Sequence, residues 1–469
     1  MRKILSPIVL ILFALPVVAQ QQARQMSLED AIQYALTESI KIKNAQITIA
    51  DAEQQIIERR AAGIPQLSGS VQYTHYLKVP KQPLPEGFDI FNIFGQALAV
   101  DLYDQLSEKT QMALDQAFQG NNGGSSDGIA FFLKNNLTAG LNLDAMVFDG
   151  SYFVALQAAR KFRQYTQVEF ATKKREVENA VTEAYLPVLL IQENIELLDK
   201  NISNLEGLLF ETTELYKAGF AEQLDIDRQK LSLANLRVER ENLVRQKQVA
   251  MENLKYNMGY PLDEPLVIAD DLGQMLTDAS PESLAAGVDL SRRPEYNLLG
   301  QAITMNELNI KLNRAGYLPS LRAFGTYQQQ YQGDDLKNGF WAPSAFVGLS
   351  LNVPIFDGLD KKAKIQRAQL DLELAKNQKE DLARAITLEV KNARANYLSA
   401  DSRLQSQKEN LELAERIYET TQVKYREGVG SSLEVTQAEQ SLYSSQSNYM
   451  QALYDLLLAK ARLDMALGM

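Results

Sequence analysis

Short sequence patterns in the first half of the chain return in the second half at an almost constant offset. Residues 147–150 (VFDG) return as residues 355–358 (IFDG), 208 positions later. Residues 215–219 (LYKAG) return as residues 424–428 (KYREG), 209 positions later. Because the order of the patterns is the same in both halves, the sequence predicts two copies of one architecture.

Each copy reads as a helix, two strands, a very long helix, a tight turn and a shorter helix. In the first copy, residues 20–258, the predicted elements are helices 27–62, 150–218 and 221–258, strands 67–79 and 130–147, and an extracellular loop 80–129. In the second copy, residues 294–469, they are helices 294–316, 359–427 and 430–467 and strands 320–331 and 341–355. Residues 259–293 are rich in Pro, Gly and Asp and are predicted to form an equatorial connector.

The first residues have the pattern of a secretory signal. Arg2 and Lys3 precede an apolar run that ends in small residues at Val18 and Ala19. A basic start, a short apolar middle and a small residue at the end are typical of a cleaved signal peptide. We therefore predict that residues 1–19 are removed and that the protein leaves the cytoplasm.

The composition excludes several kinds of chemistry. The chain has no cysteine and one histidine, His75, which rules out thiolate metal sites, disulfides and clusters of histidine ligands. The sequence contains no phosphate-binding loop and no combination of a nucleophile with a base, so we predict no cofactor and no enzyme activity. Loss of Arg2 and Lys3 leaves 46 basic against 59 acidic residues, a net charge near −13. Because nucleic acid is bound by neutralising its phosphates, we expect no nucleic-acid partner.

Apolar residues recur at alternating steps of three and four along both long helices. The first series is Ile195, Leu198, Ile202, Leu205 and Leu209, continued by Thr212 and Tyr216; the second is Leu411, Ala414, Tyr418, Thr421 and Tyr425. Such a narrow seam is typical of coiled coils, whereas a helix of a globular protein carries a broader apolar stripe. Pro187 is expected to kink or break the first long helix. An extended structural coiled coil and the wall of a helical barrel both fit this pattern.

The predicted strands alternate apolar and polar residues over roughly 12 to 17 positions, where soluble strands usually have ~3–10. Strands of outer-membrane proteins need ~9–11 residues for the bilayer and place apolar residues outward and polar residues inward. Aromatic residues near the strand ends suit the two membrane interfaces: Phe131 and Trp341 near the loops, Phe148 and Phe356 at the other end. Four strands cannot close a barrel, and lipid does not tolerate an open sheet edge. The sequence therefore predicts an oligomer in the outer membrane, without fixing the number of copies.

These residues closely resemble the TolC-like outer membrane efflux family. The most specific parts are 293–295 (RPE) followed by 319–321 (PSL), the corner 354–358 (PIFDG), and the paired Tyr-x-x-Gly helix turns. The resemblance implies an α+β membrane protein: a homotrimer with a twelve-stranded β-barrel that is continued by a long α-helical barrel. It also implies a passive exit duct of a tripartite efflux pump or a type I secretion system. The implied partners are a periplasmic adaptor, an inner-membrane pump of the RND or ABC type, and outer-membrane lipid.

The resemblance also places a functional site at the periplasmic ends of the helices. Gly219 and Gly428 suit the left-handed backbone that ends a helix, and the resemblance adds that these turns contact the adaptor. Asp225 and Glu434 are implied at the tunnel entrance, although an acid in the first turn of a helix is also favoured by the helix dipole.

The remaining gate positions differ from the family pattern or have a simpler interpretation. Tyr216 and Tyr425 could hold the tip closed, or could be ordinary seam residues. The second acid of the family falls at Gln437, and the gating arginine falls at Gly430.

A periplasmic adaptor-type protein or a structural coiled coil is the alternative interpretation. Adaptors normally carry one coiled-coil hairpin flanked by compact β domains. Two copies of a unit with two strands and two long helices fit that class less well.

Overall fold

The computed structural model describes residues 24–82, 105–112, 129–130, 133–273, 275 and 287–469. The chain divides into a mainly helical unit (Met1–Ile56, Gln157–Lys311 and Lys362–Met469) and a unit built around a sheet (Ile57–Leu156 and Leu312–Lys361). The predicted signal, residues 1–19, and most of the predicted loop 80–129 lie outside the described residues.

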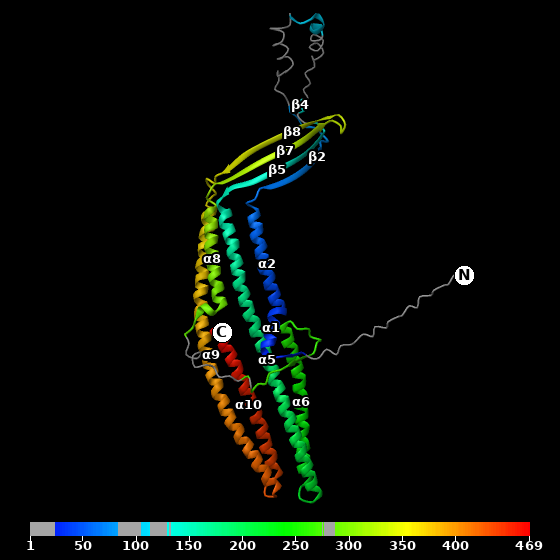
Figure 1. Cartoon of the computed structure of the whole chain (residues 1–469), viewed down its shortest axis with the longest axis vertical. Helices are drawn as coiled ribbons and strands as arrows, with labels where there is room; N and C mark the ends of the chain where they lie inside the picture. The colour runs from blue at the N-terminus through cyan, green and yellow to red at the C-terminus, as the bar shows by residue number, and fades with distance from the viewer. Residues whose placement is uncertain (1–23, 83–104, 113–128, 131–132, 274, 276–286) are drawn as a thin grey trace, which may run out of the picture. The chain divides into compact units, whose positions relative to one another are not determined.

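The sheet unit contains four antiparallel strands in the order β2-β5-β7-β8 (Figure 1). Their bounds are Gln66–His75, Asn135–Asp149, Ser320–Gly333 and Gly339–Asn352. The central pair, β5 and β7, joins the two halves of the sequence in one ladder. As a consequence β2 from the first copy and β8 from the second copy form the two edges.

The register of the ladders separates the side chains into one apolar and one polar face. Large apolar side chains stand fully in the open, with Val347 89% and Val71 75% exposed. The opposite face carries hydroxyl and amide groups that bond across strands: Thr326 Oγ1 donates to Asn142 Oδ1 over 3.0 Å, and Gln330 Nε2 donates to Asn136 Oδ1 over 3.2 Å. The strand alternation expected from the sequence is therefore present as two chemically distinct faces.

Three strand boundaries differ from those predicted by three residues or more. β2 ends at His75 rather than at residue 79, and β5 begins at Asn135 rather than at residue 130. Beyond them the backbone N–H of Tyr76 still donates to Lys134 O over 2.8 Å, and the described residues also form a short separate ribbon of β3 (Lys81–Gln82) and β4 (Ile129–Ala130). β8 ends at Asn352 because Pro354, two residues on, has no N–H to donate to a ladder.

The helix predicted over residues 27–62 is two helices, α1 (Leu28–Glu38) and α2 (Ile40–Ala61). They are separated at Ser39, whose ψ of 132° is extended rather than helical. The reason is a close approach from elsewhere in the chain: a Cβ atom added to Gly259 would lie 3.0 Å from Ser39 Cα. This packing contact cannot be read from the local sequence, which is periodic throughout.

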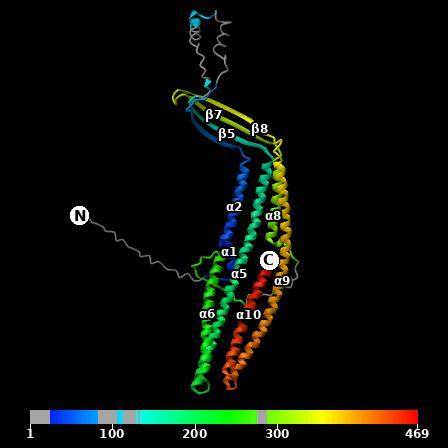
Figure 2. The ribbon, with the colours of Figure 1, turned by 180° about the vertical axis from the view of Figure 1, so that it is seen from behind.

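Two antiparallel helix pairs dominate the helical unit, as Figures 1 and 2 show from opposite sides. The first pair is α5 (Gly150–Lys217) with α6 (Gln223–Met258), and the second is α9 (Asp360–Arg426) with α10 (Ser432–Leu467). A shorter helix, α8, spans Pro294–Ala315. The break expected at Pro187 is absent, because α5 continues through it within a buried layer that includes Tyr185, Leu186, Val188 and Leu189.

The main apolar core lies where these helices meet the connector. It joins Val181 and Leu189 of α5 to Val390 of α9 and Leu463 of α10. The connector itself is held by a parallel pair of short strands, β1 (Arg24–Met26) and β6 (Leu266–Ile268). None of the helices in the described part of the chain is long and apolar enough to cross a membrane.

The close approach at Gly259 generates a stability prediction. Gly259 has φ +72° and caps α6, so Gly259→Ala forces a side chain into a left-handed backbone and against Ser39. We expect the free energy of unfolding to fall by about 1–3 kcal/mol, measured by denaturant titration followed by circular dichroism. Gly207→Ala is the matched control, since Gly207 lies inside α5 with nothing within 4 Å of an added Cβ, and it should stabilise by about 1 kcal/mol. Equal effects of the two substitutions would contradict this packing.

Candidate functional site

The two long helix pairs end in turns of the same construction. Gly219 and Gly428 have φ of +84° and +75°, and no atom lies within 4 Å of a Cβ added to either. The residue after each glycine donates its backbone N–H back into the helix: Phe220 N to Leu215 O over 2.8 Å and Val429 N to Lys424 O over 3.0 Å. Helix capping therefore requires both glycines. Beside them, the side chains of Phe220 and Val429 are 83% and 78% exposed.

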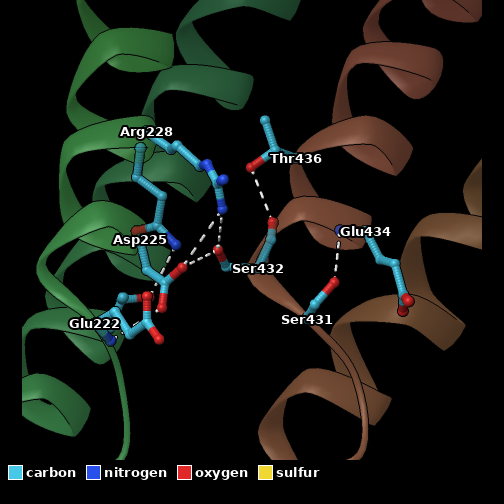
Figure 3. A network of polar contacts seen from close by, with 9 residues as sticks. Glu222, Asp225, Arg228, Ser431, Ser432, Glu434 and Thr436 are labelled. Atoms are coloured by element: carbon cyan, nitrogen blue, oxygen red, sulfur yellow. Dashed lines mark hydrogen bonds and ion pairs between the residues drawn. The ribbon is translucent and has the colours of Figure 1, made fainter.

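Asp225 lies between the two helix pairs rather than on an open surface. One carboxylate oxygen accepts the backbone N–H of Glu222 over 3.0 Å and caps α6, and the other accepts the hydroxyl of Ser432 at the start of α10 (Figure 3). Arg228 Nη1 lies 3.8 Å from Asp225 and 3.5 Å from the Ser432 hydroxyl. The Asp225 side chain is only 16% exposed. Asp225 thus both caps its own helix and links the two hairpins.

A second polar link joins the same hairpins on another side. The guanidinium of Arg426, in the last turn of α9, makes two bonds of 3.1 and 3.2 Å to the carboxylate of Glu211 in α5. A two-bond arginine–carboxylate pair is geometrically specific. Because both side chains are about half exposed, its contribution to stability is small.

The other acid of the predicted entrance is placed differently from Asp225. Glu434 occupies the first turn of α10, where its backbone N–H donates to Ser431 Oγ over 3.2 Å. Its carboxylate is exposed and points away from the Asp225–Ser432 link (Figure 3). The two acids are therefore not equivalent: one is covered and bonded, and the other is open to solvent.

The two predicted gate tyrosines also differ. Tyr216 is 43% exposed. Tyr425 packs against a small apolar cluster that contains Leu205, Leu208, Leu233 and Val435, from α5, α6 and α10. The Tyr425 hydroxyl is buried and has no hydrogen-bond partner among the described residues. The structure therefore brings Tyr425, but not Tyr216, into the packing between the hairpins.

At Gly430, where the related family carries an arginine, the turn leaves little room. A Cβ added there would lie 3.1 Å from both Lys424 Cβ and the backbone N of Tyr425. The backbone N–H of Gly430 also donates to Lys424 O. A larger residue at position 430 would have to shift this turn. Gly430 has no side chain that could form a salt bridge between the hairpins, and here the Asp225–Ser432 hydrogen bond links them.

The predicted interface aromatics lie in the sheet unit. The ring of Trp341 contacts the ring of Tyr331 in a tilted arrangement, with 5.4 Å between centroids, in a row of paired residues that also contains Leu137 and Tyr73. Phe148 lies at the opposite end of the same sheet, paired with Leu321. Phe356 follows β8 and is 82% exposed, and Phe131 lies outside the described residues.

Sequence reasoning missed the partners that join the hairpins. Ser432, Arg228 and the Arg426–Glu211 pair were not singled out, and neither was Glu439, a buried acid in α10. Only Arg228 carries a local signal, since it stands three positions after Asp225 on the same helix face. Ser432 lies 207 positions from Asp225, so no local pattern could pair them.

Comparison with known proteins agrees with this architecture. Residues 292–469 match the family described as outer membrane efflux protein. The outer membrane protein TolC of Vibrio cholerae is 22% identical over 337 residues, covering 71% of this chain and 76% of the relative. The alkaline protease secretion protein AprF of Pseudomonas aeruginosa is 26% identical over 341 residues, covering 69% and 68%. Residues 292–469 therefore belong to the outer membrane efflux protein family, and most of the chain is similar to TolC-like outer membrane proteins.

Solved structures show a similar fold for nearly the whole chain. The Campylobacter jejuni CmeC outer membrane channel superposes with a TM-score of 0.69 at 15% identity, covering 94% of this chain and 85% of CmeC. The outer membrane protein VceC of Vibrio cholerae superposes with a TM-score of 0.67 at 16% identity, covering 94% and 96%. At these identities the similarity establishes the fold.

The link between the hairpins can be tested through Ser432. Ser432→Ala removes the hydroxyl that bonds Asp225, a loss of about 1 kcal/mol for one side-chain hydrogen bond. We expect amide hydrogen exchange in the first turns of α10 to rise by about fivefold, the factor that corresponds to about 1 kcal/mol. Ser441→Ala is the control, because the Ser441 hydroxyl bonds only the carbonyl of Gln437 in its own helix. Unchanged exchange in Ser432→Ala would show that the contact does not hold the hairpins together.

Proposed function

We propose that this chain is one protomer of an outer-membrane exit channel that serves a tripartite efflux pump or a type I secretion system. The conduit is passive, and the energy comes from an inner-membrane pump. The observation that carries the proposal is the four-stranded sheet with one fully exposed apolar face and one polar face. That arrangement fits a wall between lipid and water.

The apolar face has the composition expected against hydrocarbon. Its exposed side chains, on β2, β5 and β8, include Leu67, Val71, Leu141, Leu143, Val347, Leu349 and Leu351. A soluble monomer rarely leaves so large a contiguous apolar patch in water. The tyrosine and tryptophan row at one end and Phe148 at the other fit the two interfaces of the bilayer.

We further propose a homotrimer with a closed twelve-stranded barrel. The two edge strands, β2 and β8, run in opposite directions because every neighbour in the sheet is antiparallel. β8 of one copy can therefore pair with β2 of the next in an ordinary antiparallel ladder. In lipid this closure satisfies edge N–H and C=O groups that would otherwise cost several kcal/mol each.

The helices offer matching surfaces for neighbouring copies. Along α6, Leu224, Leu231 and Val238 stand seven positions apart and are 51%, 64% and 58% exposed. Along α9, Leu413, Ile417 and Val423 are 49%, 47% and 56% exposed. The α6 line has heptad spacing and needs a partner helix, and a ring of repeated hairpins supplies one beside the exposed apolar residues of α9.

The proposed partners are a periplasmic adaptor and an inner-membrane pump of the RND or ABC type. The relatives carry names of both systems, such as the alkaline protease secretion protein and a toluene efflux pump outer membrane protein from Pseudomonas putida. The adaptor is proposed to contact the turns at Gly219 and Gly428, where Phe220 and Val429 present apolar side chains to solvent. The proposed entrance and gate lie at the turn ends of the hairpins, with Asp225 and Tyr425 between the hairpins and Glu434 and Tyr216 exposed beside them.

If the two acids lie at the entrance, replacing Glu434 and replacing Asp225 should change the cation selectivity of the channel by different amounts. In planar bilayers the wild-type protein should form channels that prefer cations, and Glu434→Gln should lower that preference by several-fold because its carboxylate is free to act on passing ions. Asp225→Asn should change selectivity less, because the Asp225 charge is covered and lies beside Arg228. The measurement is the reversal potential in a salt gradient. Absence of channels would contradict the function, and unchanged selectivity in Glu434→Gln would remove Glu434 from the entrance.

The proposed docking turns can be tested without disturbing the glycines. Phe220→Asp and Val429→Asp replace exposed apolar side chains at equivalent positions, so we expect adaptor binding to weaken by about tenfold or more and export to fall. Binding is measured on the purified, detergent-extracted channel with the purified adaptor. Ile47→Asp, an exposed apolar position on α2, is the control and should bind as the wild type does. Full binding by both turn variants would show that the adaptor docks elsewhere.

A further inference from the structure

One face of α10 makes the contact with the opposite hairpin. Ser432 bonds Asp225 of α6, Val435 packs against Leu205 and Leu208 of α5, and Gln446 accepts a 2.9 Å hydrogen bond from Asn201 of α5. These positions are separated by three and eleven residues, about one and three helical turns, which places them on one side of the helix. Glu439 and Leu442 fall on the same side, between Val435 and Gln446. Glu439 therefore faces the seam between the hairpins.

Glu439 is an unusual residue for such a position. It is 2% exposed, and its single hydrogen bond within the described residues comes from the Tyr443 hydroxyl of its own helix, over 2.6 Å. No lysine, arginine or histidine in the described part of the chain forms an ion pair with it. Burial raises the pKa of the Glu439 carboxyl, and the Tyr443 bond offsets only part of that effect. A buried, unpaired carboxylate is costly, because the charged form loses its hydration.

The titratable groups around Glu439 do not compensate its charge. From α9, Tyr418 lies near it, and burial together with the Glu439 charge raises the pKa of Tyr418 to about 12. The charged groups next to Tyr418, Arg426 of α9 and Glu211 of α5, are bonded to each other. On α6 the charges nearest the seam are Asp225 and Arg228, which contact one another and Ser432.

We infer that Glu439 makes the seam between the two hairpins separable in response to pH: protonated Glu439 holds the hairpins together, and ionised Glu439 favours their separation. This inference deepens the proposed function and rests on it, because separation of the hairpins is what would open the periplasmic end. Glu439 acts through the packing of α10 and does not need to contact cargo.

The direction follows from the two states of the carboxyl. In the packed seam its pKa is raised by burial, whereas after separation water restores the ordinary value of 4.5. An acid whose pKa is raised in one state stabilises that state fully at low pH and loses the contribution as pH rises through the raised value. Acidification toward pH 4.5 should therefore close the seam, and neutral pH should loosen it.

The test uses the purified full-length protein in detergent and in planar bilayers. The chain has no cysteine, so Lys230→Cys on α6 and Gln440→Cys on α10 introduce two exposed spin-label sites without background. In the wild type, the distance between the labels should shorten and the conductance should fall between pH 7.5 and 4.5. In Glu439→Gln, which keeps an acceptor for Tyr443 without the charge, the short distance should already be present at pH 7.5 and should not change. Glu439→Leu provides a second neutral variant and should respond in the same way.

Glu412→Gln is the matched control, because Glu412 is an exposed acid on α9 that takes no part in the seam. It should keep the wild-type response of distance to pH. A Glu439→Gln protein that still responds as the wild type does would overturn the inference while leaving the channel function intact. Absence of channels in every variant would instead defeat the proposed function, and the label distances would still decide the role of Glu439.

Discussion

The rest of this structure depends on one open sheet, whose edge N–H and C=O groups need hydrogen-bond partners and whose apolar face needs an apolar environment. Four antiparallel strands from the two sequence copies share a ladder, which leaves β2 and β8 as unpaired edges. The exposed apolar face fits lipid, and lipid does not tolerate free backbone N–H and C=O groups. The proposed closure with further copies would resolve both demands, and it would also give the exposed apolar residues on α6 and α9 their partner helices.

The helical unit contains two kinds of contact with different physical consequences. Near the connector, Leu463, Val390 and Leu189 form a dry apolar core whose separation would be costly. Toward the turns the contact becomes a narrow apolar cluster mixed with Asp225, Ser432 and the buried Glu439. This difference suits a protein whose helices stay packed near the connector and separate near the turns. Polar groups at the turns can exchange their protein partners for water when the helices separate.

Much of the architecture was predictable from periodicity, because repeated patterns, coiled-coil spacing and strand alternation are local properties. In the second predicted seam, from Leu411 to Tyr425, Ala414 is buried and the other four positions are half-buried. In α5 the fully buried line is Asn201, Leu205, Leu208 and Thr212, so that the prediction agreed only at Leu205 and Thr212. The break at Ser39, the early end of β2 and the pairing of Asp225 with Ser432 depend on contacts between distant segments. No local pattern encodes those contacts.

The most direct test of this account is the mass of the intact particle extracted from the outer membrane, measured by native mass spectrometry in detergent. The account predicts three copies of the mature chain, retained as long as the detergent covers the apolar face of the sheet. A folded single chain that stays soluble without detergent, with its strands intact by circular dichroism, would contradict it.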